Sequence, residues 1–345
     1  MSEHFTARAI VKNLLRGEPP PRPLLMPIIF SLGARLENLP LREFQANPTK
    51  ITNALRQIRN VLKVDGLTCY FDPFLEAEAL GCKREWLADG SCRLSAPSFS
   101  GIDDLRQQLN TPDSLADKGH IPIACQVIQR LKVMLKDEPA LVSYLSGPFT
   151  LAAQLMGRET SAKAGPPQDL VEFAAEATAA ISKSLLEAGT DVVFLREGCL
   201  PEFTRDRCKW YSSLLTPIAN VIRFYEALPV LLLGAGAFSE ENQVVIAECN
   251  WDLLPCPSVS DPTVRLEPWL ANRELSIGWA IPPQAFERNR LNSRDLDNFL
   301  QLSNCRLLTS SVDLPPTTDI PQLTAGLRTI RQLFEQQQPL SHPSS

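Results

Sequence analysis

Asp72 is the acidic residue best placed to do chemistry, because it directly follows the apolar segment 69–71 (Cys-Tyr-Phe). Apolar walls raise the pKa of a carboxyl group or hold the carboxylate against a cationic intermediate, so this position suits a catalytic acid. Asp72 also precedes Pro73, and a helix cap is the alternative role that the spacing leaves open.

Two features downstream of Asp72 could also serve a site. Glu76 and Glu78 would point to different faces of a helix, so we expect one of them to face the site and place Glu76 first because it is nearer the strand end; a solvated charge is the alternative interpretation. The turn 147–150 (Gly-Pro-Phe-Thr) precedes a helix, where free backbone N–H groups could bind a carboxylate or phosphate. A tight structural turn is the alternative interpretation.

Histidines are few and cysteines are scattered. His4 and His342 lie near the ends, so His120 is the one histidine expected inside the fold. We interpret it as a surface residue, with a proton-carrying role only if its segment folds over the site. The nine cysteines include no Cys-x-x-Cys pair and are odd in number, which indicates a reducing compartment. No metal site and no nicotinamide site are predicted.

The scaffold is indicated by short apolar segments that alternate with longer amphipathic or alanine-rich ones, as is typical of βα units. Helix starts at Asn47-Pro48 and Asp261-Pro262 and a helix end at Gly189 support this pattern. The expected strands are 23–30, 65–71, 141–147, 190–196, 228–234, 253–259, 274–281 and 305–311, and the expected helices are 48–63, 122–136, 168–188, 205–226, 262–272, 293–303 and 319–337. We predict an α/β fold, namely a (β/α)8 TIM barrel.

Residues 83–120 interrupt the alternation, because they form a long polar segment rich in glycine and proline. We expect an insertion after the second strand, of the kind that forms lids or pocket walls. The remainder, about 7–337, would be the core of a single domain spanning 1–345.

A barrel brings the residues just past each strand's carboxyl end to one opening, where nearly all barrel enzymes act. Asp72 is the expected catalytic residue there. Substrate contacts are expected from Ser31, Arg35, Glu76, Phe149, Thr150, Arg196, Glu197, Trp279, Ser311 and Asp313.

Composition excludes several classes of protein. The formal net charge is −5 and lysine and arginine are dispersed, so no nucleic-acid partner is expected. The sequence has no long apolar run, and charged residues are spread through its first thirty positions, so neither a membrane span nor a secretory signal is expected. We expect a cytoplasmic protein.

Several motifs together resemble the uroporphyrinogen decarboxylase superfamily, especially its branch of corrinoid and coenzyme M methyltransferases. They include GARLENLPLREFQANP, VDGLTCYFDPFLEAEALGC, SGPFTLAAQLMG, LLEAGTDVVFL, SIGWAIPP and VDLPPTT, which span nearly the whole chain. The resemblance implies a β/α barrel and allows a homodimer, as in some relatives. In the decarboxylases an aspartate that stabilises a protonated pyrrole sits nine residues before the glycine of an Ala-Leu-Gly motif, and Asp72 and Gly81 have this spacing.

The sequence departs from both branches. The decarboxylases' arginine-rich first-strand motif reads IIFSLGAR here, with Arg35 alone in a comparable place, and the histidine near the last strand is absent. In the methyltransferases a His-x-Cys pair and a later cysteine hold zinc, which activates a thiol. Here Leu232 and Gly234 occupy the places of that pair, so zinc is not expected.

The resemblance therefore predicts an enzyme that transfers a methyl group involving a small methylated compound or a methylcorrinoid, without the family zinc. A corrinoid would be a substrate or ligand, and a corrinoid protein a partner. One alternative is decarboxylation of uroporphyrinogen or a smaller carboxylated ring. Another is a non-catalytic protein that binds a corrinoid or porphyrin.

Overall fold

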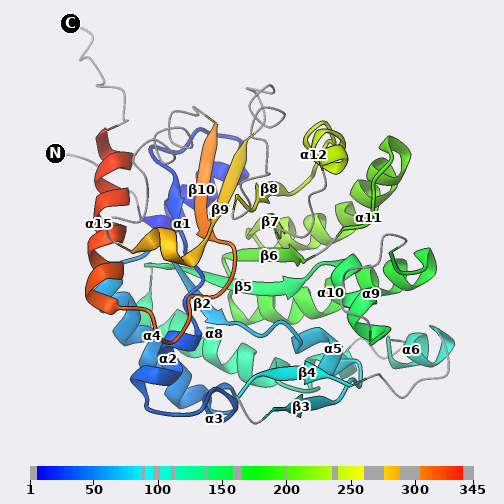
Figure 1. Ribbon diagram of the computed structural model, residues 1–345, viewed down its shortest axis with the longest axis horizontal. Coiled ribbons are helices and arrows are strands. Elements are labelled where there is room, and N and C mark those ends of the chain that lie inside the picture. The colour runs from blue at the N-terminus through cyan, green and yellow to red at the C-terminus, as the bar shows by residue number, and fades with distance from the viewer. Residues whose placement is uncertain are drawn as a thin grey trace, which may run out of the picture.

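Eight parallel strands form the wall of the protein, in the computed structural model shown in Figure 1. The structure describes residues 6–87, 90–95, 102–109, 113–136, 138–157, 165–198, 200–234, 240–259, 276–287 and 304–336. The strands are β1 (Leu24–Leu25), β2 (Gly66–Tyr70), β5 (Ala140–Ser146), β6 (Val192–Glu197), β7 (Leu228–Leu233), β8 (Leu254–Pro257), β9 (Ile277–Ile281) and β10 (Cys305–Ser310).

The strands are ordered β2-β5-β6-β7-β8 in one sheet and β1-β10-β9 in the other. Ser258 and Ala280 form a parallel bridge between β8 and β9, and on the opposite side Asp65 N donates to Leu25 O over 3.0 Å. These contacts join the sheets into a ring, so the predicted (β/α)8 barrel is confirmed.

Each predicted strand is present, although β1 is much shorter than 23–30. Its ladder stops because Pro27 has no N–H group to donate. Beyond this point Ile28 N donates to the side chain of Ser310 over 2.8 Å.

Two separate apolar cores explain why the strands are apolar on both faces. The interior core contains side chains such as Met26, Tyr144 and Phe194, and Ile10 and Val11 from the first helix join it. The outer core fills the space between the strands and the surrounding helices. Buried strand residues therefore point either into the barrel or away from it, and this decides which of them can reach the mouth.

Every expected helix that falls within the described residues is present (Figure 1). The barrel is also surrounded by helices that were not expected, among them α1 (Ala7–Leu15), α2 (Ser31–Leu36), α3 (Leu41–Gln45) and α12 (Glu240–Ala247). Asn47 caps a helix by accepting from Lys50 N, and Gly189 ends another in the left-handed conformation at φ 113°. The expected helices 262–272 and 293–303, with Asp261, lie outside the described residues. The other helices are α4 (Pro48–Leu62), α5 (Leu75–Ala79), α8 (Ile121–Leu135), α9 (Pro148–Leu155), α10 (Gln168–Ala188), α11 (Arg205–Phe224) and α15 (Ile320–Gln336), with a 3-10 turn at Pro283–Phe286.

The expected insertion after the second strand is present. It contains an antiparallel hairpin of β3 (Arg84–Trp86) and β4 (Cys92–Leu94), followed by α6 (Ile102–Leu109) and α7 (Asp113–Ala116). The hairpin lies beside α5, just beyond the carboxyl end of β2 (Figure 1). None of the helices in the described part of the chain is long and apolar enough to span a bilayer.

Candidate active site

Arg196 is the sequence-predicted residue that faces the barrel interior at the carboxyl end of a strand. On β6, Phe194 belongs to the interior core and Leu195 to the outer core, so alternation directs Arg196 inward. Burial lowers the pKa of the Arg196 guanidinium, against the raising effect of the charge of Glu197. Its Nε atom is buried without a hydrogen-bond partner among the described residues. Such a guanidinium is suited to bind an anion that enters the mouth.

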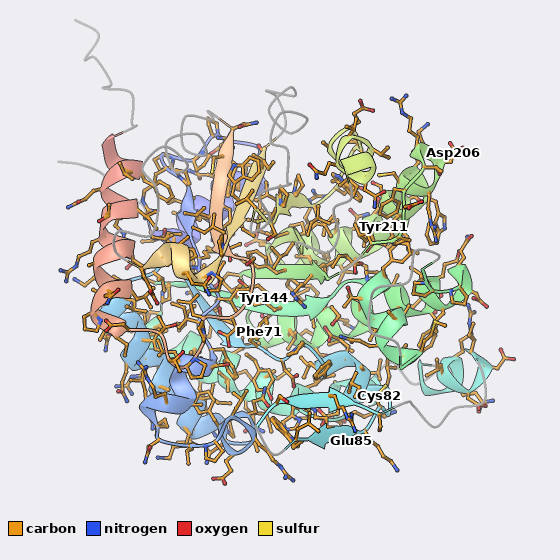
Figure 2. The ribbon with its side chains drawn as sticks, viewed as in Figure 1. Phe71, Cys82, Glu85, Tyr144, Asp206 and Tyr211 are labelled. Carbon is orange, nitrogen blue, oxygen red and sulfur yellow. The ribbon has the colours of Figure 1, made fainter. Side chains whose placement is uncertain are left out.

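Aromatic rings lie below Arg196 inside the barrel. Tyr144 stacks on Phe194 with ring centroids 4.6 Å apart, and Phe71 meets Tyr144 edge-on at 5.6 Å. Figure 2 shows Phe71 and Tyr144 close together near the centre of the molecule. The floor of the mouth is therefore apolar and aromatic, which the sequence analysis did not predict.

Asp72 is buried at the end of β2 and is already engaged by two partners. Its Oδ1 accepts from Phe74 N at 2.9 Å, and its Oδ2 accepts from Arg84 on the inserted hairpin. Burial raises the pKa of Asp72, while the charge and hydrogen bond of Arg84 and the Phe74 N–H act in the opposite direction. The bond to Phe74 is a local turn contact, and the residue at the N-cap of α5 is Phe74 itself.

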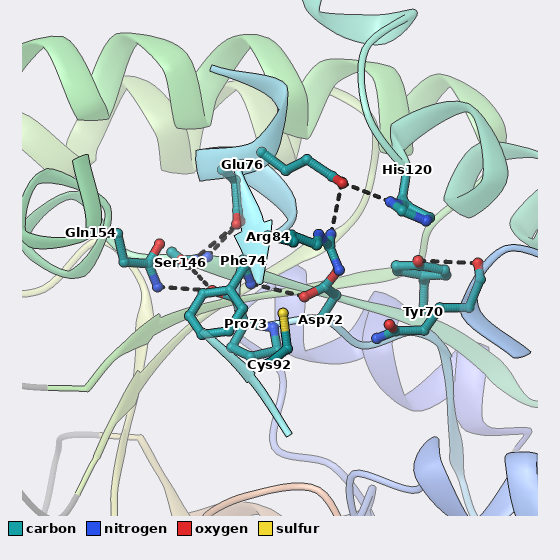
Figure 3. A network of polar contacts seen from close by, with 12 residues as sticks. Tyr70, Asp72, Pro73, Phe74, Glu76, Arg84, Cys92, His120, Ser146 and Gln154 are labelled. Atoms are coloured by element: carbon teal, nitrogen blue, oxygen red, sulfur yellow. Dashed lines mark hydrogen bonds and ion pairs between the residues drawn. The ribbon is translucent and has the colours of Figure 1, made fainter. Parts of the chain in front are cut away.

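Arg84 extends this contact into a polar chain (Figure 3). Its Nη2 lies 2.7 Å from Glu78 Oε2, which is also 2.7 Å from His120 Nδ1. Burial would raise the pKa of Glu78, but the hydrogen bond from His120 and the charge of Arg84 outweigh it, and the pKa is lowered. The interpretation of Glu78 as a solvated charge is therefore wrong, because both neighbours hold its carboxylate.

His120 ends this chain beside a pocket of about 640 Å³. Its ring lies over Tyr70, with centroids 6.5 Å apart. The pocket is lined by Arg42, Glu43, Ala46, Glu78, Cys82, Lys83, Arg84, Trp86 and His120. The four side chains Asp72, Arg84, Glu78 and His120 thus connect the end of β2 with this pocket.

Glu76 is fully buried and bonded to strand β5. Its Oε1 accepts from Ser146 N at 2.5 Å and its Oε2 from Ser146 Oγ at 3.2 Å. Burial raises the pKa of Glu76 to about 7, although these hydrogen bonds act in the opposite direction. Ser146 pairs with Arg196 in the strand register. Glu76 is consequently a carboxyl group able to exchange a proton near neutral pH. It is hydrogen-bonded to Ser146, the residue that pairs with Arg196.

The turn before α9 is occupied by the protein's own carboxylate. Glu197 accepts from Phe149 N at 3.0 Å, from Thr150 N at 2.9 Å and from the Thr150 hydroxyl, and Tyr211 also donates to it. A Cβ atom on Gly147 would lie 2.3 Å from Glu197 Oε1. The expectation of free N–H groups at this turn is therefore corrected: they bind Glu197, which points away from the barrel interior.

Four other residues expected to contact substrate, Asp313, Ser31, Arg35 and Ser311, differ in how far they are buried. Asp313 accepts from Phe30 N at 2.8 Å, from Ser31 N at 2.9 Å and from the Ser31 hydroxyl, and burial raises its pKa to about 6. It fixes the start of α2, on which Arg35 is exposed. Ser311 is buried just past β10.

Trp279 does not line the mouth. It belongs to the outer core, whereas the next residue on β9, Ala280, belongs to the interior core. The expectation of a substrate contact from Trp279 is corrected by this alternation. Gly234 lies at the end of β7, and Gly236 is outside the described residues.

Similarity to known proteins places this barrel in a family. A sequence model described as uroporphyrinogen decarboxylase (URO-D) matches residues 6–207. The chain belongs to the URO-D family. The resemblance inferred from the sequence motifs is thereby confirmed.

Two known proteins add detail to the URO-D assignment. A methylated-thiol–coenzyme M methyltransferase from Methanosarcina mazei is 28% identical over 132 residues, which are 37% of this chain and 35% of that protein. The match thus spans about a third of the relative's length. A solved methyltransferase structure from Methanosarcina mazei superposes with a TM-score of 0.71 at 15% identity, covering 96% of this chain and 100% of that one. The second likeness shows a shared fold.

The residues present do not fit the zinc that the sequence resemblance implies for methyltransferases of the URO-D family. Leu232 is buried in the interior core, and a Cβ atom on Gly234 would lie 3.0 Å from the backbone oxygen of Glu197. Within the part of the chain that the structure describes, no three histidine, cysteine or carboxylate side chains gather as a metal-binding group. Cys256 and Cys305 are fully buried thiols whose pKa values burial raises.

Some residues of the site had no signal in the sequence. Arg84 lies in the irregular insertion, and nothing in its spacing connects it with Asp72. Tyr211 occurs in an ordinary amphipathic helix, and Ser146 ends a fully buried strand. A buried carboxylate needs hydrogen-bond donors around it. The acidic residues Asp72 and Glu197, each at the end of an apolar strand, therefore indicated that donors would be found nearby, although not which ones.

Proposed function

We propose that this chain catalyses methyl transfer between a small anionic thioether or thiol and a corrinoid, free or carried by a partner protein, without a zinc ion. The observation that carries the proposal is Arg196, whose half-buried side chain is directed inward at the mouth and whose buried Nε has no hydrogen-bond partner among the described residues. The similarity of 132 residues to a methylated-thiol–coenzyme M methyltransferase supports the reaction class.

Arg196 binds the anionic group of the substrate in this proposal. A partly buried guanidinium gains more from an anion than a fully exposed one does, because less water competes for its N–H groups. The aromatic floor formed by Phe71, Tyr144 and Phe194 packs against the apolar part of the ligand and excludes water from the reacting methyl group.

Glu76 handles the proton. When the methyl group leaves a thioether sulfur, the C–S bond breaks and the sulfur retains the electron pair as a thiolate, which then takes up one proton. A carboxyl group with a pKa of about 7 can supply that proton at neutral pH, and Glu76 accepts a hydrogen bond from the hydroxyl of Ser146, the residue that pairs with Arg196 in the strand register. The reverse reaction returns the proton to Glu76.

In this proposal Asp72 has a structural role, because its carboxylate holds Arg84 of the inserted hairpin against the end of β2. Its charge is compensated by Arg84, so little of it remains to stabilise a protonated pyrrole. The spacing of Asp72 and Gly81 favours decarboxylation as the second candidate. A uroporphyrinogen, however, carries many carboxylates, and Arg35, the arginine expected to receive them, is exposed on α2.

The test mixes the purified protein with a reduced corrinoid and a methylated thioether that bears a carboxylate or sulfonate. We expect methylation of the corrinoid, followed by its absorption spectrum, and Arg196→Met should raise the KM for the thioether about 10- to 100-fold. Arg93→Met, which removes an exposed guanidinium from the hairpin, is the control and should change neither constant.

Three results would contradict the proposal. Release of carbon dioxide from uroporphyrinogen without methyl transfer would select the decarboxylase. A shifted corrinoid spectrum without turnover of any methyl donor would select a binding protein. Activity that appears only after zinc is loaded, with zinc retained on dialysis, would refute the zinc-free route.

A further inference from the structure

Two cysteines far apart in the sequence lie close together where α11 meets the end of α12. Cys208 is on α11 and Cys249 lies just beyond the end of α12, and each thiol shifts the pKa of the other. Cys208 is buried and its Sγ also lies 3.8 Å from Val245 O, whereas Cys249 is half-buried. Both are free thiols.

The surrounding fold holds the two thiols in this arrangement. Trp251 Nε1 donates to Ile246 O over 2.9 Å, so the chain on either side of Cys249 is tied back onto α12. Ser212 on α11 donates to Asn250 O, and Thr216 one turn later contacts Asp252. These bonds fasten the segment after α12 against α11 over several residues, and the thiols meet inside that contact.

The environments of the two thiols differ in a way that suits stepwise oxidation. The hydrogen bond from Cys208 lowers the pKa of Cys249, and the Ser212 hydroxyl, the Asn250 N–H and the charge of Lys209 act in the same direction. The hydrogen bond with Cys249, together with burial, raises the pKa of Cys208. A half-buried thiol that a reagent can reach, beside a buried thiol that it cannot, is the arrangement of an attacking and a resolving cysteine.

We propose that Cys208 and Cys249 form a reversible disulfide when the protein meets hydrogen peroxide. The Cys249 thiolate attacks one peroxide oxygen and breaks the O–O bond, which gives a sulfenic acid and a hydroxide that is protonated to water. The Cys208 sulfur then attacks the Cys249 sulfur, forms the S–S bond and expels a second water with its own proton. The two sulfurs lose two electrons and the peroxide gains them, and a dithiol such as dithiothreitol restores both thiols.

This disulfide would join α11 to the end of α12. Helix α11 also carries Tyr211, which bonds to Glu197 at the end of β6, and α12 follows β7 in the chain. The modification therefore connects the outer supports of two neighbouring strands whose carboxyl ends form part of the mouth. It is independent of the proposed methyl transfer.

The test treats the full-length reduced protein with a small excess of hydrogen peroxide and maps its thiols by alkylation and peptide mass spectrometry. We expect a crosslinked peptide pair containing Cys208 and Cys249, the loss of two alkylatable thiols and their complete return with dithiothreitol. A crosslink of Cys256 with Cys305 or of any pair involving Cys199, or peroxide consumption that leaves Cys249 alkylatable, would overturn the proposal.

Variants separate the two roles. Cys249→Ser should abolish the crosslink, and Cys208→Ser should stop the reaction at a Cys249 sulfenic acid that a dimedone reagent traps. Cys208→Ala serves as a second version if the serine destabilises the buried position. Cys125→Ser is the matched control, because Cys125 is half-buried with a pKa that burial raises to about 11, and its loss should leave the crosslink unchanged. Equal crosslinking in Cys249→Ser and the unaltered protein would refute the assignment.

Discussion

Arg84 on the inserted hairpin forms an ion pair with Asp72 at the end of β2, and both side chains are almost completely buried. The insertion is therefore attached to the barrel by a charge contact, in addition to apolar packing. The same guanidinium holds Glu78, and through it His120 (Figure 3). The predictions below begin from this contact.

Replacing Arg84 with methionine should destabilise the protein by about 3–5 kcal/mol, because the carboxylate of Asp72 would remain buried without its partner. The measurement is urea unfolding at pH 7. Asp72→Asn combined with Arg84→Met should recover a large part of this loss, since the buried negative charge is then gone. Arg93→Met removes the exposed pair with Glu85 on the same hairpin and should cost less than about 1 kcal/mol. Equal losses for the two arginines would mean that the buried pair contributes no more than a surface one.

Glu76 should make stability depend on pH. Its pKa is about 7 when folded and near 4.5 when unfolded, so the folded state binds the proton more tightly. The free energy of unfolding should fall as the pH rises from about 4.5 to about 7, by about 3 kcal/mol from this group, and then level off. Glu76→Gln should remove that part of the slope.

Denaturant titrations at half-unit pH intervals test this slope. Asp313, with a pKa of about 6, contributes a slope of the same sign below that pH and remains in the variant. The difference between the two proteins is therefore most specific between about pH 6 and 7. Glu43→Gln, an exposed change on α3, should leave the profile unaltered. A variant profile that parallels the original through this window would show that Glu76 does not titrate there.

Gly234→Ala should destabilise the protein by about 1–3 kcal/mol, because the new Cβ atom would press against the backbone of Glu197 and Gly198 at 3.0–3.3 Å. Gly198→Ala is a matched control in the neighbouring segment, since the nearest atom to its Cβ is 3.9 Å away. Thermal unfolding of both variants gives the comparison. If Gly234→Ala is as stable as Gly198→Ala, the two backbones are further apart than described.

Tyr211→Phe should cost about 1.5–3 kcal/mol, because the buried carboxylate of Glu197 would lose a charge-assisted hydrogen bond. Tyr225→Phe removes a hydroxyl that bonds to Glu187 at the exposed end of the same helix, and it should have little effect. Chemical denaturation measures both. Comparable small losses would place Glu197 in its neutral form, for which one hydrogen bond matters less.

The fold was predictable because each strand is buried on both faces and therefore appears as a continuous apolar segment. Because both faces are apolar, the sequence does not show which side chains of a strand point into the barrel. Nothing in the segment 274–281 indicates that Trp279 faces outward while Ala280 faces inward. The alternation of side chains along each strand in the structure gives these directions. It also shows that Arg196 points into the barrel and Glu197 away from it. Helices α1, α2, α3 and α12 were not predicted. Helix α1 is short and near an end, and α2 is held by Asp313 from a distant part of the chain. The ion pair between Arg84 and Asp72 could not be predicted either, because no regular sequence spacing relates a residue in an insertion to its partner on a strand.

The close approach of Gly234 to the chain at Glu197 limits which side chains position 234 can accept. A ligating side chain at this position needs room that the neighbouring strand end now fills. A single substitution would therefore introduce strain at this position before it introduced a metal ligand, and a zinc site built here would also require the adjacent backbone to shift.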